Sequence, residues 1–231
     1  MAEFGGLTDH FGLATSDLIF ITSTYVPRAM SRADARDENN DIAAATWFGN
    51  TAGALIDVSC TYALKSGTFD LSTLDIGELS TGVFAGSIAA TTGNNAWPQV
   101  VVSGVLGAEA MTAVSGFYNY WALPAITISG IKAAQLMAFT VDAGCRLTDS
   151  SLTATCDFAQ QDDALGEPAA HGLSGAVAAL SASFQSITTA NGWTLAGSWT
   201  ETQAPSDDEP QAAYHTGTGT AEQILTRTAT P

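Results

Sequence analysis

The sequence predicts an all-β fold, a β-sandwich or barrel with long loops and at most one or two short helices. Residues 55–62 and 151–158 alternate polar and apolar side chains, a period of two that is typical of strands with one buried face. Short apolar segments recur along the whole chain and are separated by turn signals rich in Gly, Pro, Asn and Asp, which favours many short strands. Residues 108–116 are the best helix candidate, and their apolar spacing fits a helix poorly.

The first predicted strand is the apolar segment 17–22, and Pro27 limits the chain after it to a strand edge or strand start. A charged stretch, 31–41, follows. We expect it to form an exposed loop or a long hairpin, with its turn at Asn39–Asp41, because Asn and Asp tolerate left-handed backbone angles. Residues 41–48 and 55–64 are then expected to be two strands around the glycines at 49 and 53.

The rest of the chain adds further predicted strands and connections. The strand candidates are 67–74, 99–105, 125–131, 135–141, 149–158, 171–184, 193–202 and 225–228. Residues 160–168 and the acidic, proline-bounded segment 204–210 are expected to be loops. The absence of a repeat or a low-complexity linker indicates one domain covering residues 1–231.

The charge pattern excludes some partners. The chain has 7 Lys and Arg against 23 Asp and Glu, a formal net charge of −16, so it cannot supply the clustered cations that bind a nucleic-acid backbone. Anionic membranes are disfavoured for the same reason. Two interpretations remain: an acidic protein kept dispersed by self-repulsion, or a surface that must release a passing polyanion. Charged residues are only 13% of the chain, which suits a surface largely covered by neighbouring subunits.

The cysteines and the N-terminus indicate the compartment. Cys156 occupies an apolar position of an alternating segment, so we expect a buried thiol there, and a disulfide between two of Cys60, Cys145 and Cys156 stays open. The first residues lack the basic-then-apolar layout of a secretory signal, so we expect assembly in a reducing cytoplasm. No segment reaches the ~20 continuous apolar residues of a membrane span.

Catalytic and metal-binding motifs are absent or incomplete, so we expect no enzyme, metal or cofactor. His10, His171 and His215 have no second His or Cys at metal-ligand spacing. Asp37–Asp41 matches the opening of a calcium loop, but Ile42 stands where such a loop needs Gly. The glycine-containing segments 172–175 and 217–220 lack the remainder of a nucleophile elbow and of a dinucleotide fingerprint.

Three segments together resemble the tail tube (major tail) proteins of long-tailed bacteriophages: Ser31–Thr46, with its charged loop and strand entry, Ala143–Phe158, like one of the family's paired strands, and Asn191–Thr220, with a GWTL strand and an acidic loop. They cover less than half of the chain. This chain is longer than the compact members of that family. The extra length is therefore assigned to the low-charge segment at about 79–131, and it stays open whether this segment is an insertion on the outside of a tube or part of the ring contact.

The resemblance implies a virion protein whose subunits form rings, usually six-fold, that stack into a hollow tube for genome passage. The partners are then other copies of the chain and other tail proteins, and sequence-specific nucleic-acid binding is not expected. A head-to-tail contact that stacks without closing generates a filament. A lumen lined with carboxylates would repel DNA phosphates, which fits the excess of acids. Whether the tail is contractile stays open.

Two sets of residues follow as candidates. Subunit-interface candidates are Arg32, Arg36, Phe117, Tyr118, Tyr120 and Trp121, although the aromatic cluster also suits an ordinary core. Lumen-facing candidates are Asp57, Asp70, Asp75 and Glu78. Competing functions are a capsid-decoration or tail-completion protein, a carbohydrate-binding β-sandwich that stacks sugars on Trp side chains, and a hydrolase on a β-scaffold.

Overall fold

The structure of the chain is a computed structural model. It describes residues 4–6, 8–15, 17–28, 30–38, 40, 42–49, 55–65, 67–80, 82–94, 96–107, 112–113, 119–130, 135–136, 138–141, 145–164, 168–186, 193–195, 199–203 and 215–229. The fold is all-β, as predicted. In the described part of the chain the helical content is one short 3-10 turn, η1 (Leu71–Thr73).

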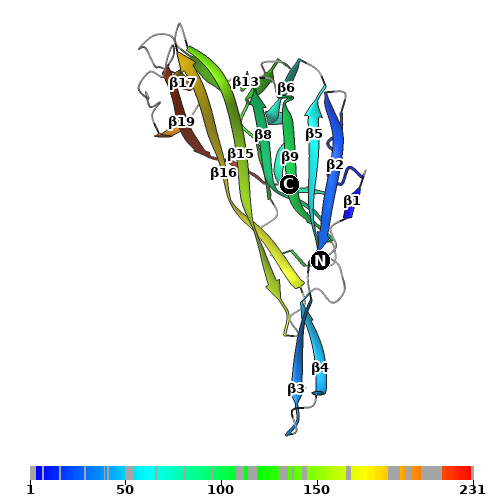
Figure 1. Cartoon of the computed structure of the whole chain (residues 1–231). Helices are drawn as coiled ribbons and strands as arrows, with labels where there is room; N and C mark the ends of the chain where they lie inside the picture. The colour runs from blue at the N-terminus through cyan, green and yellow to red at the C-terminus, as the bar shows by residue number, and fades with distance from the viewer. Residues whose placement is uncertain are drawn as a thin grey trace.

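One large sheet dominates the molecule (Figure 1). In order across the sheet, its strands are β1 (Phe4–Gly6), β2 (Leu18–Pro27), β5 (Ile56–Leu64), β9 (Gln99–Leu106), β8 (Val83–Gly93), β15 (Cys145–Asp162), β16 (Pro168–Ser186), β19 (His215–Ile224) and β18 (Thr200–Gln203). Every neighbouring pair along this path is antiparallel.

Shorter strands complete the described fold. They are β6 (Thr68–Asp70), β12 (Thr127–Ser129) and β13 (Gln135–Leu136) in one small sheet, β14 (Phe139–Val141) with β17 (Trp193–Leu195) in another, and β7 (Asp75–Ser80), β11 (Asn119–Ala122), β20 (Arg227–Ala229) and β10 (Thr112–Ala113) as branches of the main sheet. Their apolar residues, such as Ile76, Ile128 and Leu136, belong to the same buried cluster as the main sheet. The core therefore lies between these elements and one face of the main sheet.

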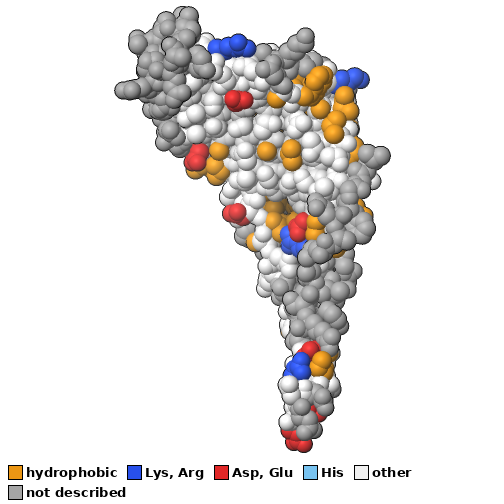
Figure 2. Space-filling view, viewed as in Figure 1, with side chains coloured by type: hydrophobic (Ala, Val, Ile, Leu, Met, Phe, Trp, Pro, Cys, Tyr) orange, Lys and Arg blue, Asp and Glu red, His pale blue; other side chains and the backbone are white. Residues whose placement is uncertain are grey.

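The predicted alternation decides which face is buried. In β5, Val58, Cys60 and Tyr62 are buried, while Asp57, immediately before them, is exposed, and Ser59 and Thr61 between them are partly exposed. In β15, Leu152, Ala154 and Cys156 are buried, and Ser151, Thr153, Thr155 and Asp157 point the other way. The face opposite the core, here called the open face, is built mainly from Ser, Thr, Ala and Val side chains. Figure 2 shows it as a broad, mostly uncharged surface with scattered acidic and apolar groups.

The charged stretch after Pro27 forms a hairpin that projects from the body (Figure 1). Its strands are β3 (Met30–Arg36) and β4 (Ile42–Gly49), which pair only with each other among the described strands. Asn40 has a φ of 66° and its amide donates to the Asp37 carbonyl at 3.0 Å. This left-handed residue lies within the turn predicted at 39–41.

The strands predicted at 41–48 and 55–64 are present as β4 and β5. β4 pairs with β3, whereas β5 pairs with β2 and β9. β8 and β9, both within 79–131, lie in the interior of the main sheet. These two strands therefore contribute directly to the main sheet. The helix expected at 108–116 lies mostly outside the described residues, and Thr112–Ala113 is a strand.

Candidate functional site

Four acidic side chains lie on the open face of the main sheet. Asp57 is on β5, Asp149 and Asp157 are on β15, and Glu222 is on β19. Each is exposed, and each alternates with residues that are buried on the core side. Between them the face carries hydroxyl and small apolar groups. The open face is therefore a neutral to acidic surface, with cations at its margins: Arg28 beside Asp57 and Arg146 beside Asn94.

A shallow hollow interrupts the open face over β5, β8 and β9. It measures about 430 Å³ and is lined by Thr24, Val26, Asp57, Val58, Ser59, Gly86, Ser87, Ser103, Gly104 and Val105. Gly104 allows two strands to approach closely, because a Cβ at this position would lie 1.7 Å from the Phe84 carbonyl oxygen. Gly86 has no atom nearer than 3.8 Å to such a Cβ. Both glycines line the hollow, and neither contributes a side chain to it.

Among the described strands, the main sheet has an edge without a pairing partner on each side. β1 pairs with β2 only at Ser23–Tyr25, and no described strand pairs with Ile19–Thr22 on the side away from β5. Ile19 is 42% exposed and Ile21 48%. At the opposite edge of the sheet, β18 pairs with β19 on one side, and no described strand pairs with it on the other. An exposed edge with apolar side chains is a template for another strand.

The sheet register aligns the β2 edge with the β18 edge, because the same rows of paired residues run from one to the other. One row of paired residues runs from Ile19 across Ala63, Gln99, Thr91, Ser151, Ser181 and Thr220 to Gln203. A second runs from Thr22 across Thr61, Val101, Ala89, Thr153, Ala179 and Glu222 to Thr200. β2 and β18 also run in opposite directions, because an odd number of antiparallel steps separates them. The β18 edge of one copy has the direction and register needed to pair with the β2 edge of another copy as an antiparallel sheet.

The lumen candidates from the sequence are dispersed in the structure. Asp57 lies on the open face, whereas Asp70 accepts a hydrogen bond from the Ser72 amide at 2.9 Å at the start of η1. Asp75 and Glu78 lie on β7, and burial raises the pKa of both carboxyl groups. The structure places Asp57 on the same face as Asp149, Asp157 and Glu222 instead. Strand alternation could have found Asp157, but the face shared by these four acids depends on strand order.

The aromatic interface candidates include a core residue. Trp121 is 5% exposed and belongs to the buried cluster, on a strand paired with both β7 and β20. Its ring is therefore packed within the chain, and the expectation of an exposed anchor at Trp121 is corrected. Tyr120 is half-buried. Phe117 and Tyr118 lie outside the described residues.

The charged interface candidates lie on the projecting hairpin. Arg32 is in β3, opposite Trp47 of β4 in the register. Arg36 is exposed and donates from Nη1 to the Asn40 carbonyl at 2.8 Å, so it braces the hairpin turn. Asp34, Asp37 and Glu38 are exposed on the same hairpin. The hairpin thus presents both signs of charge.

The segment before β2 is held onto the sheet by a carboxylate. Asp9 accepts hydrogen bonds from the amides of Gly12 and Ala14, both at 2.9 Å, and from the Tyr62 hydroxyl. Burial raises the pKa of Asp9, but these hydrogen bonds outweigh it, so its pKa lies below the ordinary 3.8. Burial and the bond to Asp9 raise the pKa of Tyr62. This cluster anchors the N-terminal segment.

The thiols and histidines do not form a site within the described residues. Cys60, Cys145 and Cys156 form no disulfide with one another. Burial, with a smaller effect of Asp157, raises the pKa of Cys156 to about 12, so its thiol stays protonated and unreactive. His10 packs edge-on against Tyr25, with ring centroids 6.2 Å apart. No group of three His, Cys, Asp or Glu side chains among these residues could hold a metal ion. Asn39 and Asp41, part of the incomplete calcium-loop match, lie outside this part of the chain.

The described chain contains no helix long and apolar enough to cross a membrane. The comparison with protein-family models found no matching family, and the search of curated proteins found no matching protein.

Proposed function

We propose that this chain is a structural subunit that joins edge to edge into rings, and that the rings stack into a hollow tube like the tail tube of a long-tailed bacteriophage. The observation that carries the proposal concerns two sheet edges: no described strand pairs with the outer side of Ile19–Thr22 in β2 or of Thr200–Gln203 in β18. They lie in the same rows and run in opposite directions.

An edge-to-edge contact of this kind is heterologous, because two different surfaces of the chain meet. Such contacts generate closed rings when the rotation between copies closes, and filaments when it does not. Main-chain hydrogen bonds would join β18 of one copy to β2 of the next, and Ile19 and Ile21 would lose their exposure. In a closed sheet the strands tilt, so the register at the seam shifts by a few residues from the level of the rows.

The open face would line the lumen of such a ring. Its hydroxyl and small side chains offer no strong binding group to DNA, and Asp57, Asp149, Asp157 and Glu222 repel phosphates. Salt-dependent attachment to DNA requires Lys and Arg at the contact, and the described cations of the main sheet lie at the margins of this face. This composition suits the passage of a polyanion without retention.

The projecting hairpin supplies a contact between stacked rings. Its mixed charges, with Arg32 and Arg36 beside Asp34, Asp37 and Glu38, can pair with a neighbouring ring. Reversing Arg32 and Arg36 to Glu is expected to weaken stacking more than folding. Equal loss of both would count against this role.

Electron microscopy of the purified protein, combined with cross-linking, tests the proposal. In a Cys145→Ser background, Thr200→Cys is combined in turn with Ile19→Cys, Ile21→Cys and Thr22→Cys. One of these pairs is expected to give a ladder of disulfide-linked multimers that ends at the ring size. The control pair, Thr61→Cys with Thr200→Cys, lies in the same row, but Thr61 is inside the sheet and should give monomers. Monomers from every pair, with no rings or tubes in the images, would refute the proposal.

Closed rings that never stack would favour another virion component, such as a capsid-decoration or tail-completion protein. One observation also supports carbohydrate binding. Trp97 is 52% exposed, and its indole Nε1 donates to the Leu64 carbonyl at 2.7 Å, which fixes the ring at the surface. A stable monomer that binds a glycan array and loses binding in Trp97→Ala would establish that function instead.

A further inference from the structure

Arg28 lies where the projecting hairpin leaves the body. It stands between the end of β2 at Pro27 and the start of β3 at Met30. Its amide donates to the Leu55 carbonyl at 3.1 Å, and Leu55 immediately precedes β5. One backbone hydrogen bond therefore joins the chain entering the hairpin to the chain that returns from it.

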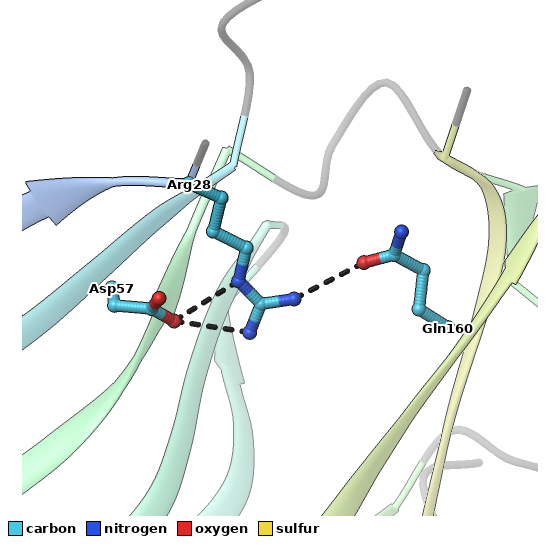
Figure 3. A network of polar contacts seen from close by, with 3 residues as sticks. All are labelled: Arg28, Asp57 and Gln160. Atoms are coloured by element: carbon cyan, nitrogen blue, oxygen red, sulfur yellow. Dashed lines mark hydrogen bonds and ion pairs between the residues drawn. The ribbon is translucent and has the colours of Figure 1, made fainter. Parts of the chain in front are cut away.

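The Arg28 side chain bridges two separate parts of the main sheet (Figure 3). Its Nε and Nη2 both donate to Oδ1 of Asp57 on β5, at 3.1 and 3.0 Å. On the other side, Nη1 donates to Oε1 of Gln160 on β15 at 3.1 Å. The guanidinium carbon is 5.5 Å from the centre of the Phe158 ring, within the range of a cation–π contact.

The β15 side of this bridge lies beyond the end of the β8 ladder, where other described contacts with the body include the Phe158 ring against Phe84 and the pairing of β10 with Ala170 and His171 of β16. The β8 ladder on β15 ends at Thr155–Ser87, and beyond it β15 continues with β16 to Asp162 and Pro168. This extension and the β3–β4 hairpin both reach beyond the end of the β8 ladder (Figure 1). Along the sheet, β9 and β8 separate β5 from β15. Arg28 connects the two across that interval.

We propose that Arg28 is a clamp that fixes the direction of the β3–β4 hairpin by binding β5 and the β15 extension at the same time. The planar fork of a guanidinium can donate to both sides and lie over a ring at once, whereas a lysine ammonium is a point charge without that geometry. The pair is partly exposed, with 31% of the Arg28 side chain and 53% of the Asp57 side chain accessible. Its stability contribution is accordingly small, and its effect is on orientation.

A role of this clamp in the stacking of rings rests on the proposed function, whereas the clamp itself is independent of that function. A hairpin that meets a neighbouring ring must leave every subunit in the same direction. A clamp of this kind restricts the hairpin before it meets a neighbouring ring. Less conformational entropy is then lost at each contact.

Distances between two spin labels on the unassembled chain test the clamp. With Cys145→Ser, labels are attached at Glu38→Cys on the hairpin turn and at Gln99→Cys on β9; both positions are exposed. The parent protein is expected to give a narrow distance distribution. Arg28→Gln and Arg28→Lys should at least double its width. Arg146→Gln is the matched control, because it removes an arginine side-chain hydrogen bond to Asn94 elsewhere on the sheet, and it should leave the width unchanged.

Gln160→Ala removes one side of the bridge with less risk to folding and should widen the distribution to an intermediate value. Unchanged widths in folded Arg28→Gln or Gln160→Ala would overturn the clamp. Because the labels report on single chains, the result is independent of tube formation. Wide distributions in the variants together with an absence of tubes in the parent would support the clamp and refute the proposed function.

Discussion

The hydroxyl of Tyr62 donates a hydrogen bond to the carboxylate of Asp9, across more than fifty residues of sequence. Tyr62 is fully buried in β5, so the bond connects the core of the main sheet to the segment before β2. Phe11, two residues after Asp9, is buried in the same cluster. The N-terminal segment is therefore part of the packed fold from Asp9 onward.

Replacing Tyr62 with Phe should lower the free energy of unfolding by about 1 kcal/mol, because one buried hydrogen bond is lost while the ring is retained. Asp9→Ala should cost about 1–3 kcal/mol, since it also removes the acceptor of two amides and leaves the buried hydroxyl without this partner. Urea denaturation measures both. Glu222→Ala, which removes an exposed carboxylate, should stay within about 0.5 kcal/mol of the parent. A parent-like Asp9→Ala would show that the segment is not anchored there.

Asp9 and the two acids of β7 should affect the pH dependence of stability with opposite signs. The pKa of Asp9 is lowered by folding, so the unfolded chain binds more protons in the window below 3.8. The stabilisation by Asp9 is complete above that value and is lost as the pH falls through the folded-state pKa. Asp9→Asn should flatten the loss of stability between about pH 4 and 2.

Asp75 and Glu78 have raised pKa values, so the folded chain binds more protons as the pH falls toward their ordinary values of 3.8 and 4.5. Each carboxylate destabilises the fold once it is charged. Asp75→Asn and Glu78→Gln should therefore raise the melting temperature at neutral pH and have little effect at pH 3. A melting temperature that falls at both pH values would contradict this assignment.

The two glycines of the open-face hollow provide a matched pair of substitutions. Gly104→Ala should destabilise by about 1–3 kcal/mol or more, because the new methyl group collides with the Phe84 backbone and must separate β8 from β9. Gly86→Ala meets nothing closer than 3.8 Å and should be nearly neutral. Thermal melts monitored by circular dichroism compare them. Equal costs at both positions would argue against a backbone clash at Gly104.

The burial of Trp121 changes the expectation for the aromatic cluster. Trp121→Ala should cost about 3–5 kcal/mol, as for other large-to-small core substitutions, so a loss of assembly in that variant would not by itself identify an interface. Tyr120→Ala, at a half-buried position, should cost distinctly less. Denaturant midpoints of the two single variants, measured before any assembly assay, separate folding from association.

The sequence predicted the strands whose side chains alternate and missed those whose side chains are small. The alternating strands β5 and β15 were placed with the correct inward faces. β8 and β19 were not predicted, since VFAGSIAATTG and HTGTGTAEQI are rich in Gly, Ala and Thr and lack a strong apolar period. Neighbouring strands support these segments: β8 pairs with β9 and β15, and β19 pairs along its whole length with β16.

Predicting the candidate surfaces required even more information from outside the local sequence pattern. The hairpin was predicted from its charges and its Asn-rich turn, but the edges at Ile19–Thr22 and β18 could not be, because an edge is defined by the absence of a neighbour. The shared face of Asp57, Asp157 and Glu222 likewise requires the strand order. Arg28 gave no signal, since its partners Asp57 and Gln160 are distant in sequence.

The longest described ladder joins β15 to β16, whose ends are separated only by residues 163–167. Closing so short a loop costs little entropy, whereas pairing β2 with β5 requires closure over the whole β3–β4 segment. We therefore expect this central hairpin to form first during refolding, with pulsed hydrogen exchange showing its amides protected before those of β2. β2 and β18 would then be added last, so the edges able to join other chains would be completed only after the core that keeps each chain separate has formed.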